Sequence, residues 1–144
     1  MRNPPIKSSL PFPDLLRELE GAIKQARRDD KDSDGRTRVY FIQESSIGAI
    51  KIGVSRHSKK RAKELQDHSL YVITLLATVE GGYSVEHALH HLFAHAYIRG
   101  EWFHPVEELI AYIAKEGEPN EVTERRERDE IFEKMRNVKG LVTP

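Results

Sequence analysis

Apolar residues recur along this chain at two different spacings. Where they lie three or four positions apart, they predict amphipathic helices over residues 13–28, 84–97 and 106–114. Short runs rich in β-branched and aromatic residues predict three strands, "TRVYFIQ" (37–43), "AIKIGV" (49–54) and "YVITLLATV" (71–79). A basic helix is expected over 58–68. This order of elements predicts a small sheet covered by helices.

Turn and linker residues divide the chain into three predicted parts. The loop "ESSIG" between the first two strands predicts a hairpin and therefore antiparallel pairing, and we expect the third strand in the middle of the sheet. A charged linker, "RRDDKDSDGR", follows the first helix. From Glu116 to Arg136, eight acidic and five basic residues are typical of a solvated helix or a mobile tail. We predict an N-terminal helix and linker (1–36), a central domain (37–115) and a charged C-terminal helix or tail (116–144).

The overall composition excludes some classes of protein but does not indicate a binding partner. Lysine plus arginine and aspartate plus glutamate both total 23 of 144 residues, so any electrostatic signal must be local. There are no cysteines, which excludes disulfides and cysteine-based zinc sites and is compatible with a reducing compartment. No run approaches the roughly 20 apolar residues of a membrane span, and the first residues lack the apolar segment of a signal peptide. We expect a soluble cytoplasmic protein with no membrane partner.

Positive charge gathers between Arg36 and Gln66. This stretch holds two acidic residues and eight basic ones: Arg36, Arg38, Lys51, Arg56, Lys59, Lys60, Arg61 and Lys63. Such a patch is typical of phosphate-backbone binding, and the alternative is a solvated helix face. Arg61 lies four residues before Leu65, on the same side of the helix, so we expect it at the edge of the core, positioned for a phosphate.

Glu86 has two possible roles. With Ser84 as N-cap it falls in the first turn of its helix, where the helix dipole favours a carboxylate. Alternatively, Glu86 and His90 share one flank of the apolar stripe and line a site at the edge of the core. Three further histidines, at 87, 91 and 95, follow the opposite face. Their spacing could bind zinc, but no HExxH motif is present, so a polar helix face is the favoured interpretation.

Tyr40 is the third residue that could carry chemistry. A tyrosine in the strand "RVYFIQ" is an ordinary core residue, but its hydroxyl needs a polar partner if it is buried. The neighbouring strand offers Lys51 and Gly53 on the face opposite to its apolar residues.

These residues occur in the order of a known family. The run "VYFIQ…IKIGVS…KKRAKELQ…LLATVEG…VEHALHHLF…GEWF" resembles the GIY-YIG endonuclease superfamily, in the phage and bacterial branch of the meiotically up-regulated gene 113 type, over about residues 37–115. The resemblance implies an α+β fold with a small three-stranded antiparallel sheet flanked by helices, here with helical N- and C-terminal extensions. It also implies phosphodiester cleavage with one divalent metal, Mg²⁺ or Mn²⁺.

The resemblance assigns roles to individual residues. Tyr40 matches a tyrosine that helps to activate the attacking water, and we expect its pKa to be lowered by the lysine and the metal beside it. Arg61 matches the arginine that binds the scissile phosphate, and Glu86 matches the metal ligand. Gly53 matches a glycine that lets the chain turn tightly beside the site. The motif "GEWF" contributes Glu101 and two aromatic residues, Trp102 and Phe103, that are expected in the core.

The sequence also departs from the family pattern. Arg38 stands where the first motif has glycine, and Lys51 stands where the second has tyrosine. The late asparagine of many members has no counterpart. Because the second tyrosine is missing, the second group that handles a proton is open between Lys51 and His57.

The first interpretation is therefore a metal-dependent DNA endonuclease. Its catalytic residues are Tyr40, Lys51, Arg61 and Glu86, with Glu86 on the metal and His57 and His90 as accessory candidates. Arg56, Lys59, Lys60 and Lys63 would bind the nucleic-acid backbone, DNA or RNA. Two alternatives stay open, a non-catalytic nucleic-acid-binding module of the same fold and a domain that docks onto a partner protein. The sequence gives no oligomeric state.

Overall fold

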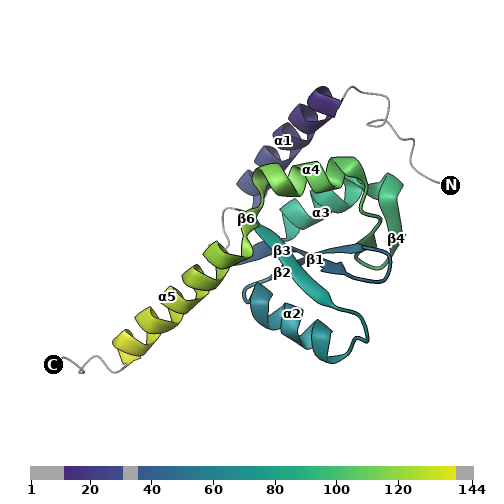
Figure 1. Ribbon diagram of the computed structural model, residues 1–144. Coiled ribbons are helices and arrows are strands. Elements are labelled where there is room, and N and C mark those ends of the chain that lie inside the picture. The colour runs from purple at the N-terminus through teal and green to yellow at the C-terminus, as the bar shows by residue number, and fades with distance from the viewer. Residues whose placement is uncertain (1–11, 31–35, 139–144) are drawn as a thin grey trace.

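The chain folds as an α+β protein in three layers, with a sheet between two layers of helices (Figure 1). The computed structural model describes residues 12–30 and 36–138. The ends of the chain and half of the predicted charged linker (31–35) lie outside the described residues. The elements, in chain order, are α1 (Phe12–Asp29), β1 (Arg38–Glu44), β2 (Ile50–Ser55), α2 (Ser58–Asp67), β3 (Ile73–Glu80), α3 (Tyr83–Leu92), a 3₁₀ turn (Ala94–Ala96), β4 (Tyr97–Arg99), β5 (Trp102–Phe103), α4 (Glu107–Glu116), β6 (Glu118–Pro119) and α5 (Asn120–Val138).

The sheet has six antiparallel strands among the described residues, in the order β4-β5-β2-β1-β3-β6. The predicted hairpin is confirmed, since Val39 pairs with Val54 and Gln43 pairs with Ile50 across β1 and β2. The expected number of three strands is wrong. β4, β5 and β6 are only two or three residues long, too short to produce a periodic sequence pattern.

The central position belongs to β1, not to the third predicted strand. β1 pairs along its whole length with both β2 and β3, whereas β3 pairs on its outer side only with the two residues of β6. The sequence of β3 suggested the middle of the sheet because it is almost uniformly apolar. The structure gives it the burial pattern of a strand near the edge, with Thr74 and Glu80 exposed.

The main core lies between one face of the sheet and helices α1, α3 and α4. The strands contribute fully buried Val39, Phe41 and Ile52, and α3 contributes Val85 and Leu89 from its apolar stripe. Helix α1 belongs to the same core: Leu19, Ile23 and Ala26 are buried in it. Burying each of the valine, leucine, isoleucine and phenylalanine side chains contributes about 1.5–3 kcal/mol.

The opposite face of the sheet carries a smaller core under the basic helix α2. Tyr40, Ile42 and Leu75 are buried there, and Ala62 and Leu65 of α2 pack against them. The alternation along β1 therefore sends Val39 and Phe41 to one side and Tyr40 and Ile42 to the other, as a period of two requires. Tyr40 thus lies on the side of the sheet that faces the positive charge.

Helix α3 begins in a way that the sequence did not indicate. The predicted N-cap, Ser84, is wrong, because the helix starts at Tyr83 after Gly82. The N-terminal amides are capped instead by Asp30, at the end of α1, whose carboxylate accepts hydrogen bonds from the backbone N–H groups of Gly82 (2.7 Å), Ser84 (2.9 Å) and Val85 (3.0 Å). Burial raises the pKa of Asp30, but these hydrogen bonds outweigh it and lower the pKa. A contact across more than 50 residues thus fixes the start of the helix that carries Glu86.

The C-terminal part is helical. Helix α5 extends away from the layered body (Figure 1), and the side chains described along 131–136 are exposed, which agrees with a solvated helix. Arg38 ties β1 to the start of this region: its guanidinium donates to Glu118 (2.5 Å) and to the Thr78 hydroxyl (2.8 Å). Arg38 is therefore committed to a partly buried ion pair. The division into three parts expected from the sequence (1–36, 37–115 and 116–144) stays a prediction.

The hairpin loop between β1 and β2 is organised by Glu44. Its carboxylate accepts hydrogen bonds from the backbone N–H groups of Ser46, Ile47 and Ala49 and from the Ser46 hydroxyl. Burial raises the pKa of Glu44, but these four hydrogen bonds outweigh it and lower the pKa from 4.5 to about 2. The ionised carboxylate therefore stabilises the loop that sets the β1–β2 register.

We expect Glu44→Gln to lower stability at neutral pH by about 1–2 kcal/mol, a few degrees in Tm. Because the pKa of Glu44 is lower in the folded state, this stabilisation is complete above about pH 4.5 and is lost as the pH falls towards 2. Melting curves between pH 2 and pH 7 should show the two proteins converging at low pH. Glu80→Gln, at an exposed strand end, is the control, and a Tm difference that does not change with pH would contradict the assignment.

Candidate active site

The Tyr40 ring lies flat against the neighbouring strand at Gly53. The two residues are direct partners in the β1–β2 register, and a Cβ added at Gly53 would lie 2.3 Å from the Tyr40 hydroxyl oxygen and 2.4 Å from the ring carbon that bears it. The expected role of Gly53 in a tight turn is therefore wrong. Gly53 lies inside β2, and its missing side chain leaves the space through which Tyr40 reaches across the strand.

The Tyr40 hydroxyl is held next to Arg61 of helix α2. Burial raises the pKa of Tyr40, and a hydrogen bond from the Arg61 side chain lowers it only in part, so the pKa is raised overall. The expectation of a lowered pKa is wrong for the protein alone, because the ring is almost fully buried and the carboxylates of Glu101 and Glu86 also raise the pKa. Tyr40 is therefore a neutral phenol at pH 7.

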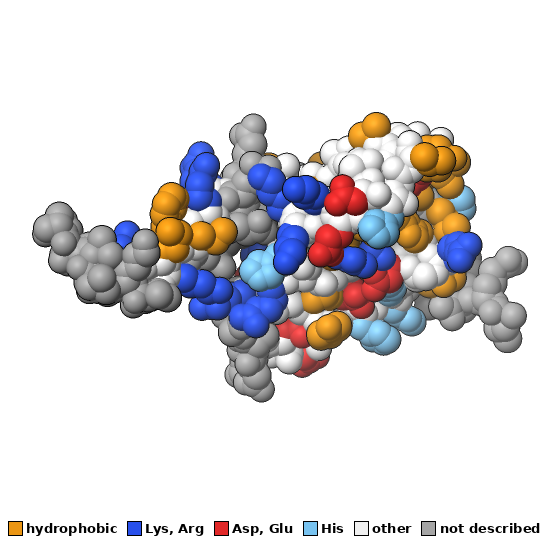
Figure 2. Space-filling view, turned by 90° about the horizontal axis from the view of Figure 1, so that it is seen from below, with side chains coloured by type: hydrophobic (Ala, Val, Ile, Leu, Met, Phe, Trp, Pro, Cys, Tyr) orange, Lys and Arg blue, Asp and Glu red, His pale blue; other side chains and the backbone are white. Residues whose placement is uncertain are grey.

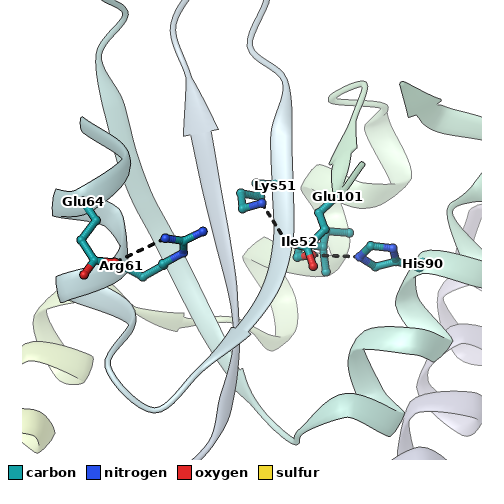
Figure 3. A network of polar contacts seen from close by, with 6 residues as sticks. All are labelled: Lys51, Ile52, Arg61, Glu64, His90 and Glu101. Carbon is teal, nitrogen blue, oxygen red and sulfur yellow. Dashed lines mark hydrogen bonds and ion pairs between the residues drawn. The ribbon is translucent and has the colours of Figure 1, made fainter. Parts of the chain in front are cut away.

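Arg61 lies at the rim of the smaller core, as the sequence predicted. Its side chain is 45% exposed and donates to Glu64 at 3.3 Å, one turn away on the same helix. The hydrogen bond with Tyr40 raises the pKa of the guanidinium further. In Figure 3 the guanidinium points from α2 towards the strand that carries Lys51. An arginine with one flexible partner and an exposed edge can still take up a phosphate.

Three potential metal ligands meet beside β2. Glu86 and His90 lie one turn apart on α3, and Glu101 follows them from the turn between β4 and β5. One ligand atom from each of the three lies within 4.8 Å of the other two. Gly100 makes this turn possible, since its φ of +57° is in the left-handed region that glycine adopts without strain.

The hydrogen bonds of His90 define which nitrogen can bind a ligand. Its Nε2 lies 2.8 Å from the backbone carbonyl oxygen of Ile52 (Figure 3). A carbonyl oxygen only accepts, so Nε2 carries the hydrogen in the neutral ring and Nδ1 keeps the lone pair. The ring is also held edge-on against Phe103, with centroids 4.9 Å apart. His90 is thus oriented as metal-binding histidines commonly are, with the distal nitrogen on a backbone carbonyl.

The two carboxylates of the cluster influence each other. Burial raises the pKa of Glu86, the neighbouring His90 lowers it, and the negative charge of Glu101 raises it again. The net direction is upward, because half-buried like charges destabilise each other's ionised form. A cation between them would relieve this repulsion.

Lys51 supplies one positive charge next to the cluster. Its ammonium donates to Glu101 Oε1 at 2.8 Å (Figure 3). The ammonium also lies 5.7 Å from the centre of the Trp102 ring. The Lys51 side chain is only 11% exposed. Trp102 is partly exposed and only Phe103 is fully buried, so the expectation of two core aromatics holds for the second alone.

Glu101 is the residue of the cluster that the sequence interpretation missed as a ligand. The sequence identifies Glu101 as part of the motif "GEWF", but the motif alone assigns it no role in metal binding or catalysis. The indication in the sequence was an acidic residue placed between a turn glycine and two aromatic residues. The fold is what brings this residue next to α3.

His57 is not part of the cluster. It lies exposed just before α2, where its backbone N–H donates to the Ser55 hydroxyl. Of the two candidates for the second proton-handling group, Lys51 is the one that lies beside the cluster.

The basic residues form the outer surface of this region. Lys59, Lys60 and Lys63 are exposed on α2, and Arg56 precedes the helix. Figure 2 shows Lys and Arg side chains gathered across this face of the molecule, with acidic and histidine side chains next to them. The other histidines of the α3 region stay apart from the cluster. His87 and His91 are exposed, and His95 pairs with Glu108 at 3.1 Å, so the favoured polar-face interpretation agrees with their placement.

The arrangement brings an arginine, a buried phenol, an ammonium and three potential metal ligands together at one place on the sheet. None of the described helices is both long and apolar enough to span a membrane.

No curated protein and no solved structure is significantly similar to the chain. The sequence model of the T5orf172 domain, however, matches residues 37–133. This domain is of the nuclease type found in phage proteins and is associated with nucleic-acid binding. The chain therefore belongs to the T5orf172 domain family.

Proposed function

We propose that this protein is a metal-dependent endonuclease of the GIY-YIG type that hydrolyses phosphodiester bonds in DNA. The observation that carries the proposal is the convergence of Tyr40 from β1, Arg61 from α2 and Glu86 from α3. The pKa of Tyr40 is influenced by both of the others, so the three groups lie within electrostatic reach of one another. Residues that serve only packing have no reason to meet in this combination of phenol, guanidinium and carboxylate.

Each side chain has a role in this proposal that follows from its chemistry. Arg61 binds a non-bridging oxygen of the scissile phosphate and neutralises the charge that builds up there. Tyr40 orients the attacking water through its hydroxyl oxygen, held in position by Arg61 and Gly53. The water oxygen forms the new P–O bond and its proton passes to bulk solvent, while the P–O bond to the leaving oxygen breaks. Lys51, with a proton on its ammonium, donates that proton to the leaving oxygen.

The residues at Glu86 fit a divalent metal. A carboxylate with a second carboxylate and an imidazole nitrogen close by is a donor set that binds Mg²⁺ or Mn²⁺. When bound, such an ion would act as a Lewis acid on the phosphate and would lower the pKa of bound water.

Incubation with supercoiled plasmid tests the proposal directly. We expect nicked and then linear product with Mg²⁺ or Mn²⁺ and none with EDTA. A duplex RNA of matched length, in a parallel reaction, determines whether the substrate is DNA alone. Binding without product under every divalent ion would favour the second candidate, a non-catalytic nucleic-acid-binding module, which the exposed basic face of α2 would serve equally well.

We expect replacement of Lys59, Lys60 and Lys63 with glutamine to weaken DNA binding for all sequences alike. These side chains are exposed on α2, so they should contact phosphates and not bases. Each lost phosphate contact should flatten the slope of log affinity against log salt by about 0.9. Lys24→Gln, on α1 beyond the other face of the sheet, is the control. A triple variant with the slope of the wild type would assign these lysines to solvated surface.

A further inference from the structure

The proposed nuclease reaction needs only one carboxylate on its metal ion, but the structure has two further donors next to Glu86. His90 and the carboxylate of Glu101 are the additional ones, and one ligand atom from each residue lies within 4.8 Å of the others. Bonds of about 2.0–2.2 Å let one ion hold ligand atoms up to about 4.4 Å apart. Small side-chain rotations would therefore bring all three onto a single ion.

We propose that Glu86, His90 and Glu101 form a three-ligand metal centre that prefers a first-row transition ion such as Mn²⁺ to Mg²⁺. The proposal rests on the proposed function, because the ion is the one that the nuclease would use. It goes further by defining the complete protein ligand set and the class of ion.

The imidazole is the reason for the preference. Mg²⁺ takes oxygen ligands and gives up its waters reluctantly, so a nitrogen ligand adds little to its binding. Transition ions accept imidazole and carboxylate together. The site has one imidazole and two carboxylates from three positions, which leaves room in an octahedral shell for waters and a phosphate oxygen.

The surroundings of the three residues support a built site. His90 is held by two neighbours, the Ile52 carbonyl at 2.8 Å and the Phe103 ring, so the ring is ordered and Nδ1 is the nitrogen that keeps a lone pair. Lys51 binds Glu101 through Oε1, which leaves Oε2 for an ion and fixes the carboxylate. The three ligands come from a helix and a tight turn that are both packed on the main core, since Leu89 and Phe103 are fully buried.

Metal titration of the purified protein without nucleic acid tests this centre. The electron paramagnetic resonance signal of free Mn²⁺ gives the Mn²⁺ affinity, and competition with Mg²⁺ gives the ratio of the two affinities. We expect the wild type to bind Mn²⁺ at least tenfold more tightly than Mg²⁺. His90→Gln should lose about tenfold or more in Mn²⁺ affinity while Mg²⁺ affinity changes little, and Glu101→Gln should weaken both. His91→Gln, an exposed histidine on the same helix, should match the wild type.

Nuclear magnetic resonance on the wild type locates bound Mn²⁺ without any variant, so it tests the proposal even if a variant does not fold. Substoichiometric Mn²⁺ should broaden the signals of His90 and Glu101 before those of His91. Equal affinity of the wild type for the two ions, or a folded His90→Gln with wild-type Mn²⁺ affinity, would overturn the proposal. Plasmid nicking on the same preparations distinguishes failure of the three-ligand centre from failure of the proposed function. If the protein nicks plasmid with metal but His90→Gln and Glu101→Gln both keep the wild-type metal affinities, only the three-ligand centre is refuted. Selective Mn²⁺ binding without nicking supports the centre and refutes only the nuclease.

Discussion

Glu86→Gln is expected to abolish metal-dependent nicking, by about 10³-fold or more, while DNA binding stays close to that of the wild type. The amide keeps the size of the side chain but loses the negative charge, and it is a much poorer metal ligand. The basic residues that would hold the DNA backbone lie on α2, on another element, and are untouched. Nicking of supercoiled plasmid and a fluorescence binding titration on one preparation measure both quantities.

The stability of this variant provides an internal check. Burial raises the pKa of Glu86, so the folded state disfavours the ionised form, and wild-type stability falls as the pH rises through this pKa. The neutral amide lacks this penalty, and Glu86→Gln should therefore melt at or above the wild-type temperature at pH 7. The control is Glu107→Gln, because Glu107 also lies in the first turn of a helix, α4, and is exposed. If Glu86→Gln nicks at the wild-type rate, Glu86 is only a helix-end charge.

Tyr40→Phe is expected to lose most of its nicking activity, about 10²–10⁴-fold, and to keep both its fold and its DNA binding. The ring fills the same space over Gly53, and only the hydroxyl that contacts Arg61 is removed. A core residue with no further role would tolerate this change. Thermal melting within a few degrees of the wild type, together with a binding titration, would show that the loss is one of chemistry.

The chain offers a matched control for this substitution. Tyr112 of α4 is also almost fully buried, in the main core, and its hydroxyl has no hydrogen-bond partner among the described residues. Tyr112→Phe removes the same atom away from the site and should nick like the wild type. Normal nicking by Tyr40→Phe would remove Tyr40 from the mechanism, and equal losses in both variants would point to a general effect on the core.

The ordered motifs of the sequence predicted much of the candidate site. Tyr40, Arg61 and Glu86 are far apart in the chain, and each residue type suits phosphodiester chemistry, so the family resemblance was enough to select them. Their local settings followed from simple periodicities: alternation separated Tyr40 and Lys51 from the apolar residues of their strands, and helical spacing put Glu86 next to His90. The geometry around Tyr40 was less predictable, because it depends on the folded sheet. Gly53 is the cross-strand partner of Tyr40 and leaves space for its ring, and burial raises the pKa of Tyr40.

The long elements, the β1–β2 hairpin and the basic helix could be predicted from the sequence, since they depend on hydrophobic period and turn residues that lie close together in the chain. Features that depend on contacts between distant segments emerged only in the folded protein. Asp30 caps α3, Arg38 pairs with Glu118, and strands of two or three residues complete the sheet. Glu101 likewise becomes a candidate ligand only because the β4–β5 turn folds back beside α3. The sequence around an acidic residue does not show which groups its carboxylate will contact. Its role is therefore determined by the side chains that the fold brings within bonding distance.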